Sequence, residues 1–170
     1  MKRLILINGT MGVGKTTVCK ELLEITQPSV FLDGDWCWNM SPFTVNDETK
    51  NMVVDNIVYL LKNFLKCSEY ENIIFCWVMH EESIISDIVE RLKDFDFEKY
   101  IFTLSISKEA LTTRLKNDID NNIRTSDIID RSIARLNMYS KMDSIKIDVS
   151  NITPREAANK ISDSINKRED

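Results

Sequence analysis

Three of the four glycines in this chain lie within the segment Gly9-Thr10-Met11-Gly12-Val13-Gly14-Lys15-Thr16. This segment matches the phosphate-binding pattern G-x-x-x-x-G-K-[ST] at every fixed position. A short apolar run at 4–7 precedes it, and a segment at 16–24 with helical spacing of apolar residues follows it. A buried strand, a glycine loop and a helix are the arrangement that the motif requires. The pattern therefore predicts a loop that binds a nucleoside triphosphate.

The chemistry of this loop follows from its backbone. Successive N–H groups and the N-terminus of the following helix form an anion site. The Lys15 ammonium can reach the β- and γ-phosphates, and the Thr16 hydroxyl can bind Mg²⁺. We assign nucleotide binding to Gly9, Thr10, Met11, Gly12, Val13, Gly14, Lys15, Thr16 and Thr17. ATP and Mg²⁺ are the expected cofactors.

Apolar runs and helical periodicities alternate along the rest of the chain. They predict further strands at about 29–32, 73–78, 100–106 and 145–149, and helices at about 47–66, 84–92, 107–116, 126–139 and from 154 onward. This alternation predicts an α/β fold: a three-layer, doubly wound, five-stranded parallel sheet of the P-loop nucleoside triphosphate hydrolase type. At this length we expect a single domain, 1–170, with a short lid at about 117–125.

Charge and composition narrow the classes of partner. A net charge of −5 disfavours a nucleic acid partner. No apolar run approaches the ~20 residues of a membrane span, so no membrane partner is expected. The four cysteines show no C-x-x-C spacing and the apolar N-terminal run is too brief for a signal peptide, which indicates free thiols in a cytoplasmic protein. We expect a monomer or a homodimer that acts on a small molecule.

Two carboxylates, Asp33 and Asp35, follow the second predicted strand. Ligands of such sheets bind at the carboxyl ends of the strands, so this pair is expected beside the phosphate loop. One carboxylate can orient Mg²⁺ while the other accepts a hydroxyl proton as general base. We assign Asp33 to the metal, together with Thr16, and Asp35 to the base, and the reverse assignment stays open. The simpler alternative is an Asp-Gly turn at the end of a strand.

Taken together, these motifs resemble the small P-loop kinases: adenylate, shikimate and gluconate kinases and the antibiotic phosphotransferases. The resemblance covers nearly the whole chain. Asp33-Gly34-Asp35 is similar to the Asp-Gly-Asp of gluconate and adenylylsulfate kinases. The segment 111–115 resembles the family's helix whose arginine packs near the adenine, which implies that role for Arg114. Arg124 and Arg135 resemble the lid arginine and the returning-helix arginine, which implies that both bind the transferring phosphoryl group.

Other interpretations of these segments remain open. The arginines could instead lie on a solvated helix face in ion pairs with Asp127 or Asp130. The third predicted strand lacks the aspartate with which motor and switch ATPases hold Mg²⁺, which argues against an AAA-type machine. The segment 159–162 fails the guanine-reading pattern Asn-Lys-x-Asp at its last position, which argues against a GTPase switch.

The segment between Arg3 and Arg91 contains no arginine to bind an acceptor phosphate, yet it carries all three tryptophans. We assign the acceptor site to Asp33, Asp35, Trp36, Trp38, Phe43, Trp77 and His80. An aromatic pocket with two carboxylates suits an uncharged or cationic hydroxyl compound. The alternatives are tryptophans buried in the core and a histidine with a purely structural role.

The motifs thus predict an ATP- and Mg²⁺-dependent phosphotransferase. It would transfer the γ-phosphoryl group to a hydroxyl of a nucleoside-, sugar- or antibiotic-like molecule. Its catalytic residues would be Lys15, Asp35, Arg124 and Arg135. The alternatives are a nucleoside monophosphate kinase and a non-catalytic nucleotide-binding module.

Overall fold

A computed structural model describes residues 1–167 and contains one five-stranded parallel sheet. Its strands are β1 (Lys2–Asn8), β2 (Ser29–Asp33), β3 (Asn72–Cys76), β4 (Phe97–Ser105) and β5 (Ile145–Asp148). They lie in the order β2-β3-β1-β4-β5, so β1 is central and the phosphate loop leaves from the middle of the sheet. The predicted α/β fold with a parallel five-stranded sheet is confirmed.

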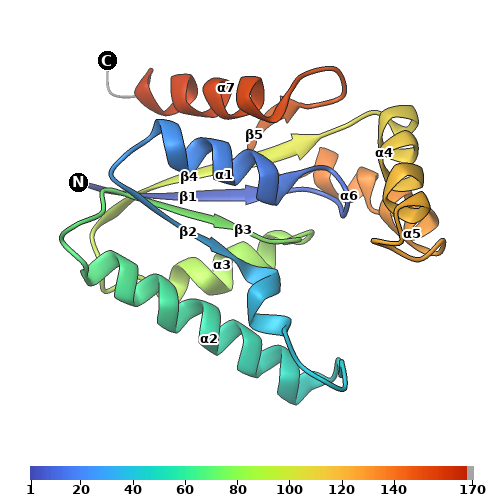
Figure 1. Ribbon diagram of the computed structural model, residues 1–170. Coiled ribbons are helices and arrows are strands. Elements are labelled where there is room, and N and C mark those ends of the chain that lie inside the picture. Colours follow the sequence, from blue (N-terminus) through green and yellow to red (C-terminus); the bar gives the residue numbers. More distant parts are fainter. Residues whose placement is uncertain (168–170) are drawn as a thin grey trace.

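Helices cover both faces of this sheet and form three layers with it (Figure 1). One face carries α1 (Lys15–Ile25) and α7 (Pro154–Asn166), and the other carries α2 (Asp47–Lys66) and α3 (Glu82–Glu90). Three further helices lie beyond the carboxyl ends of the strands: α4 (Lys108–Asp120), α5 (Ile128–Ala134) and α6 (Leu136–Ser140). A short 3₁₀ helix, η1 (Gly34–Trp38), follows β2 directly. The carboxyl ends of the strands therefore lie on the side of the sheet where α4, α5 and η1 are found (Figure 1).

The residues of strand β1 explain why helices must cover both faces of the sheet. Leu4 and Leu6 pack into the core under α2 and α3, whereas Ile5 and Ile7 pack into the core under α1 and α7. All four side chains are fully buried. Alternate residues of a strand point to opposite faces, so a continuous apolar run is what a strand covered on both faces requires.

Three of the predicted helix starts are confirmed by side-chain caps. Asn46 and Thr153 form capping boxes at the starts of α2 and α7, and Ser107 accepts a hydrogen bond from the Ala110 N–H at the start of α4. Side-chain caps of this type satisfy N–H groups that have no partner within the helix. These polar residues therefore determine where the covering helices begin.

Two sequence predictions in the second half of the chain need correction. Residues 117–120, predicted as part of the lid, belong to α4, and the connection to α5 spans only 121–127. The single helix predicted at 126–139 is divided into α5 and α6 at Arg135. The Ser132 carbonyl accepts a hydrogen bond from the Thr10 hydroxyl at 2.8 Å. In a continuous helix this carbonyl would pair with the Leu136 N–H, so the division falls where the phosphate loop competes for it.

The Thr10–Ser132 bond also fastens the phosphate loop to α5, and its contribution can be measured. Replacing the buried Thr10 by the isosteric valine should lower the free energy of unfolding by about 1 kcal/mol, because one buried hydrogen bond is lost. Chemical denaturation measures this difference. Thr113→Val, on an exposed turn of α4, is the matched control and should change stability little. Equal stability of Thr10→Val and the unaltered protein would contradict the interpretation.

Candidate active site

The phosphate loop at 9–16 connects β1 to α1, and its glycines have backbone conformations that other residues rarely adopt. Gly12 and Gly14 have φ angles of +81° and +100°. A Cβ atom on Gly12 would lie 2.4 Å from Cδ2 of Leu115 on α4. Glycine is therefore required at position 12 by both backbone and packing. The loop follows the strand and opens the helix, as the sequence predicted.

Lys15 lies at the start of α1 with its ammonium folded back over the loop. Its Nζ donates to the carbonyl oxygens of Gly9 at 2.9 Å and Thr10 at 3.1 Å. Burial lowers the pKa of Lys15, and the negative charges of Asp35 and Asp33 oppose that shift. Two carbonyls are weaker partners for a buried ammonium than the oxygens of a polyphosphate, so this arrangement is ready to exchange them for an anion.

The two predicted carboxylates lie beside the loop. Register pairs Asp33 with Cys76 on β3 and Cys76 with Ile7 on β1, which aligns the carboxyl ends of these three strands. The Thr16 hydroxyl donates to Asp33 Oδ2 at 2.6 Å, and the Asp35 N–H donates to Asp33 Oδ1 at 3.0 Å. Asp33 is thus tied to the loop and also caps η1, which projects Asp35 away from the strand.

Asp35 is an exposed residue, yet its surroundings raise the pKa of its carboxyl. Partial desolvation by the neighbouring protein groups is the largest cause, and the charge of Asp33 raises the pKa further. The pKa is lowered in turn by the charge of Lys15, by the Trp77 side chain and by the charge of Arg124. A carboxyl with a raised pKa is a stronger base when ionised, which suits a group that accepts a hydroxyl proton.

Mg²⁺ commonly binds one hydroxyl and one carboxylate of a protein. Phosphate oxygens of the substrate and water molecules then complete its coordination shell. Thr16 and Asp33 fit this requirement. Within residues 1–167 no cluster of three or more His, Cys, Asp or Glu side chains could hold a metal ion unaided. A metal here would therefore depend on ligands supplied by a bound nucleotide.

Two adjoining cavities extend from the loop toward α4 and α7. The first, of about 410 Å³, is lined by loop residues together with Asp35, Arg114, Asp118 and Arg124. The second, of about 280 Å³, is lined partly by Val149, Ile152 and Pro154. Arg114 lines both cavities. The first cavity has mainly polar walls and the second has more apolar ones, and the role that the resemblance implied for Arg114 stays a prediction.

The two arginines nearest the loop differ in how firmly they are held. The Arg114 guanidinium donates to the carbonyl oxygens of Val13 at 3.0 Å and Val149 at 2.5 Å, so it joins the loop to the end of β5. Arg124 forms an ion pair with Asp118, with Nε 3.0 Å from Oδ2. Among the described residues Arg124 pairs with neither Asp127 nor Asp130, whereas Arg131 pairs with Asp127 at 3.3 Å.

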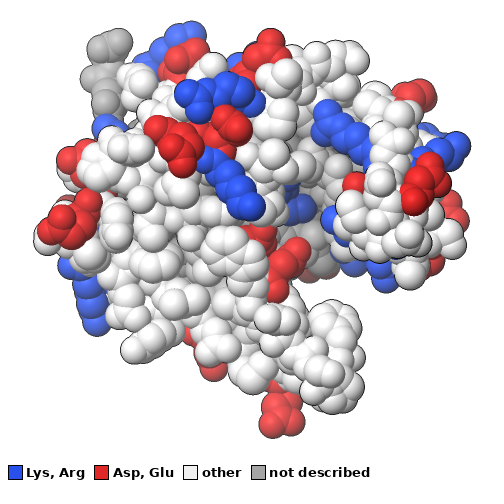
Figure 2. Space-filling view, viewed as in Figure 1, with Lys and Arg blue, Asp and Glu red and all other residues white. Residues whose placement is uncertain are grey.

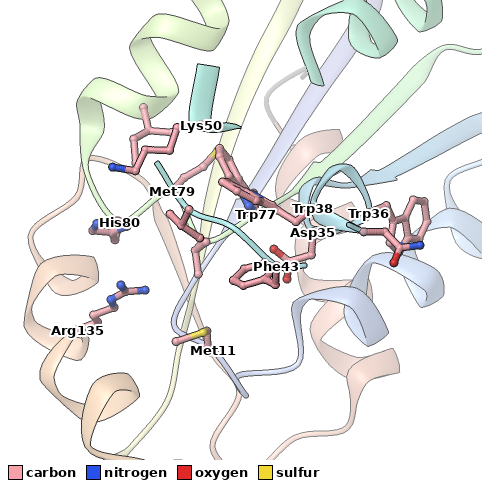
Figure 3. A pocket seen from close by; sticks show the side chains of 14 residues that line it. Met11, Asp35, Trp36, Trp38, Phe43, Lys50, Trp77, Met79, His80 and Arg135 are labelled. Atoms are coloured by element: carbon pink, nitrogen blue, oxygen red, sulfur yellow. The ribbon is translucent and has the colours of Figure 1, made fainter. Parts of the chain in front are cut away.

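A larger cavity of about 880 Å³ lies on the other side of Asp35 (Figure 3). It is lined by Met11, Asp35, Trp36, Trp38, Asn39, Phe43, Val45, Lys50, Trp77, Val78, Met79, His80, Ile84 and Arg135. Its size falls in the range of ordinary ligand pockets, and its walls are mainly apolar, as such pockets require.

Figure 2 shows a notch between the α4–α5 lobe and the protrusion that carries the loop after η1. Lys/Arg and Asp/Glu side chains are interspersed on that face of the molecule.

The structure gathers the predicted acceptor residues but gives them unequal positions. Trp38, Phe43 and Trp77 lie around the middle of the cavity, and the rings of Trp38 and Phe43 are 5.9 Å apart. Trp36 is 54% exposed, packs edge-on against Phe31 and lies at the outer end beyond Asp35 (Figure 3). Asp33 is buried beneath the loop and does not line this cavity. Its assigned contact with the acceptor stays a prediction.

Trp77 owes its position to Gly34. A Cβ atom on Gly34 would lie 2.5 Å from Trp77 Cγ and 2.7 Å from its Cδ1. Gly34→Ala should therefore displace the indole and lower the free energy of unfolding by about 1–3 kcal/mol, the usual cost of overpacking. Denaturation and the tryptophan emission spectrum measure both effects. In a Trp77→Ala background the same substitution should cost much less, and an equal cost there would contradict the steric explanation.

Three cationic or potentially cationic residues of this cavity come from separate elements. Lys50 lies on α2, His80 follows β3, and Arg135 is the junction of α5 and α6. Sequence reasoning assigned Arg135 to the phosphates beside Arg124, but the two line different cavities here. Lys50 and Met79 were not predicted as site residues. The position of Lys50 one turn into α2 gives no motif from which its contribution could be found.

All four cysteines are free thiols, as predicted. Across the described part of the chain, no helix combines the length and apolar character needed to cross a bilayer.

Comparison with known proteins identifies the family of this chain and several solved structures with a similar fold. A family model described as an AAA domain matches residues 5–135. No curated protein matches the chain in sequence. Among solved structures, a tunicamycin resistance protein from Deinococcus radiodurans aligns with a TM-score of 0.70 and 19% identity, over 97% of this chain and 96% of that one.

Two small-molecule kinases are similar in the same way. A gluconokinase from Sinorhizobium meliloti 1021 gives a TM-score of 0.68 at 14% identity, covering 99% of this chain and 98% of its own. A shikimate kinase from Acinetobacter baumannii gives 0.65 at 19% identity, covering 99% and 95%. At these identities the likeness concerns the fold, which is that of the small P-loop kinases. The sequence argument against an AAA-type machine concerns activity and stays a prediction.

Proposed function

This chain belongs to the AAA domain family, and we propose that it is an ATP- and Mg²⁺-dependent phosphotransferase that acts on a hydroxyl of a small molecule. One observation carries the proposal: the Asp35 carboxylate lines both the phosphate-loop cavity and the large aromatic cavity. A group that lies between a phosphoryl donor site and an acceptor pocket is where a general base for transfer must be. We take 1–170 as a single catalytic domain with a short lid near 121–127.

In this mechanism the loop amides and Lys15 bind the polyphosphate, with the Lys15 ammonium leaving the Gly9 and Thr10 carbonyls. Thr16 and Asp33 would hold Mg²⁺, which when bound neutralises charge on the phosphate oxygens. Arg124 exchanges Asp118 for phosphate oxygens. Most of the rate gain then comes from positioning and from charges arranged in advance.

Asp35 accepts the proton of the acceptor hydroxyl as its oxygen bonds to the γ-phosphorus. The bond between that phosphorus and the β,γ-bridging oxygen breaks, and ADP leaves with the electron pair. The Trp77 side chain lowers the pKa of this carboxyl and so favours its ionised form, which is the form that accepts the proton. The similar structures support this class, since two of them are kinases of small molecules and the third is a tunicamycin resistance protein.

A nucleoside monophosphate kinase is the alternative with the same donor chemistry. It would place an acceptor phosphate next to Asp33 and Asp35, where two carboxylates repel a dianion. A non-catalytic nucleotide-binding module would leave the aromatic cavity and the raised pKa of Asp35 without a use. Both alternatives therefore explain fewer features of the site than a hydroxyl kinase does.

A metabolite library incubated with ATP and Mg²⁺ and read by mass spectrometry tests the proposal. We expect a phosphorylated product from at least one hydroxyl compound that has an apolar or ring-shaped body. Comparing nucleosides with their monophosphates in the same assay distinguishes a hydroxyl kinase from a nucleoside monophosphate kinase. ATP binding without transfer to any pooled compound would instead favour the non-catalytic module.

A further inference from the structure

The way in which α4 ends determines the position of Arg124. Asn122 has a φ of +57°, in the left-handed region. Its N–H donates to the Ile119 carbonyl at 2.9 Å, and the Ile123 N–H donates to the Asp118 carbonyl at 2.8 Å. This pattern is a Schellman motif, which satisfies carbonyl groups of the last helical turn. The next residue, Arg124, reaches the Asp118 carboxylate, with Nε 3.0 Å from Oδ2.

Both members of this ion pair line the phosphate-loop cavity, as do Lys15, Thr16 and Asp35. The Arg124 side chain is 35% exposed and that of Asp118 is 32% exposed. Charges that are partly shielded from solvent are screened less by salt than charges on an open surface. The pair is therefore part of the cavity wall, and a polyphosphate that binds the loop competes with Asp118 for the guanidinium.

The charges of this wall show what Asp118 does to a bound nucleotide. Among the described residues, the cations of the cavity are Lys15, Arg114 and Arg124, and its carboxylates are Asp35 and Asp118. Each cation that is free to turn toward a polyphosphate stabilises it, and each carboxylate opposes it. Asp118 acts in both ways, because it holds one of these cations and carries a negative charge itself. Nucleotide affinity is therefore lower with Asp118 than with a neutral residue at this position.

The position of Asp35 indicates which phosphate Arg124 can reach. Asp35 lies at the junction of the phosphate-loop cavity and the large aromatic cavity, and the γ-phosphoryl group has to lie at this junction for transfer. The charge of Arg124 lowers the pKa of Asp35, so the guanidinium lies near the junction. Arg114, in contrast, is held by two carbonyl groups and also lines the second cavity. Arg124 is therefore the guanidinium best placed for the γ-phosphate.

We propose that Asp118 is a positioning residue that competes with the γ-phosphate of ATP for the Arg124 guanidinium. It weakens the binding of ATP, and it takes the guanidinium back once the γ-phosphoryl group has left with the acceptor. With ADP the ion pair stays closed, so ADP binds through the loop without Arg124. This inference deepens the proposed function and rests on it for the identity of the nucleotide, but its first test concerns affinity alone.

Isothermal titration calorimetry with Mg²⁺ and two nucleotides tests the competition without any phosphoryl transfer. One is ADP, and the other is the ATP analogue in which an imido group replaces the β,γ-bridging oxygen. Asp118→Asn should bind the ATP analogue about fivefold more tightly than the unaltered protein and should bind ADP within about twofold. The substitution keeps the backbone carbonyl that Ile123 contacts, so the connection keeps its position. Asp118→Glu, which retains the charge, should restore most of the original affinity.

A double-mutant cycle separates competition for Arg124 from simple repulsion of phosphate by a carboxylate. In an Arg124→Gln background, Asp118→Asn should leave the affinity for the ATP analogue nearly unchanged. An equal gain in that background would mean that Asp118 acts by direct repulsion, which would overturn the inference. A gain of the same size for ADP and for the ATP analogue would also overturn it.

Asp120→Asn is the matched control, because Asp120 is the exposed last residue of α4 and the change in charge is the same. It should change neither affinity. Thermal unfolding of each variant verifies that the fold is intact. Failure of the unaltered protein to bind either nucleotide would overturn both this inference and the proposed function.

A second arm uses the phosphorylated product identified by the library assay. Arg124 without its carboxylate partner should stay with the transferred phosphoryl group, so Asp118→Asn should show product inhibition about fivefold stronger than the unaltered protein. Unchanged product inhibition would overturn the recapture of Arg124 while leaving the kinase proposal intact. Selective tightening of the ATP analogue without transfer to any compound would support the competition and contradict the proposed function.

Discussion

Replacing Lys15 by alanine should lower kcat/KM by about 10²–10³-fold, equivalent to about 3–4 kcal/mol of transition-state stabilisation, if its ammonium acts as a donor preorganised for developing charge. The structure explains why no other group can substitute. Lys15 is half-buried at the start of α1, and within the described residues its Nζ has only the carbonyls of Gly9 and Thr10 as hydrogen-bond partners. Steady-state kinetics with ATP and the acceptor found by the library assay measure the effect.

Lys20→Ala provides the control for this experiment, because Lys20 lies on the exposed side of the same helix, α1. That variant should keep its activity. The Lys15 variant should unfold no more readily than the unaltered protein, since burial of its ammonium opposes the charged form in the absence of phosphate. Turnover like that of the unaltered protein in Lys15→Ala would remove the proposed mechanism.

Asp35→Asn should lower kcat by about 10²–10⁴-fold, the range that a positioned general base contributes. The same substitution should raise the free energy of unfolding of the ligand-free protein at neutral pH. A carboxyl whose pKa is higher in the folded state destabilises the fold as the pH rises through that interval, and the penalty is complete above the folded pKa. The neutral amide does not carry this penalty.

The pH profile of kcat/KM gives an independent check on Asp35. Activity should fall toward acid with a midpoint above 3.8, the ordinary aspartate pKa, because partial desolvation and Asp33 raise the pKa of this carboxyl. Asp47→Asn, a change at an exposed carboxylate at the start of α2, should alter neither rate nor stability appreciably. An Asp35→Asn variant that is both active and less stable would contradict the assignment of the base.

Local patterns in the sequence predicted the fold closely. The apolar run of β1, the capping residues Asn46, Ser107 and Thr153, and the alternation of strands and helices depend on interactions between near neighbours. Boundaries were less accurate: β3 ends at Cys76 rather than near 78, and β4 begins at Phe97 rather than near 100. Where a strand ends depends on pairing with β1, which no local pattern contains.

The division of α5 from α6 could not be predicted for a related reason. It depends on a hydrogen bond between Thr10 and Ser132, residues more than a hundred positions apart. That division also determines where the Arg135 side chain lies. The sequence resemblance placed Arg135 with the phosphates, whereas the fold places it in the aromatic cavity.

What the sequence alone determined is the phosphate-loop half of the site. The loop from Gly9 to Thr16 and the carboxylates that follow β2 are contiguous segments whose geometry their own backbone imposes. What only the tertiary structure decided is the large aromatic cavity. Lys50, Trp77 and Arg135 come from three distant segments, and their common cavity exists because α2, the end of β3 and the α5–α6 junction pack around one end of the sheet. Spacing along a chain encodes contacts within a turn or a strand, but the sign of the charge that meets a substrate depends on packing between elements.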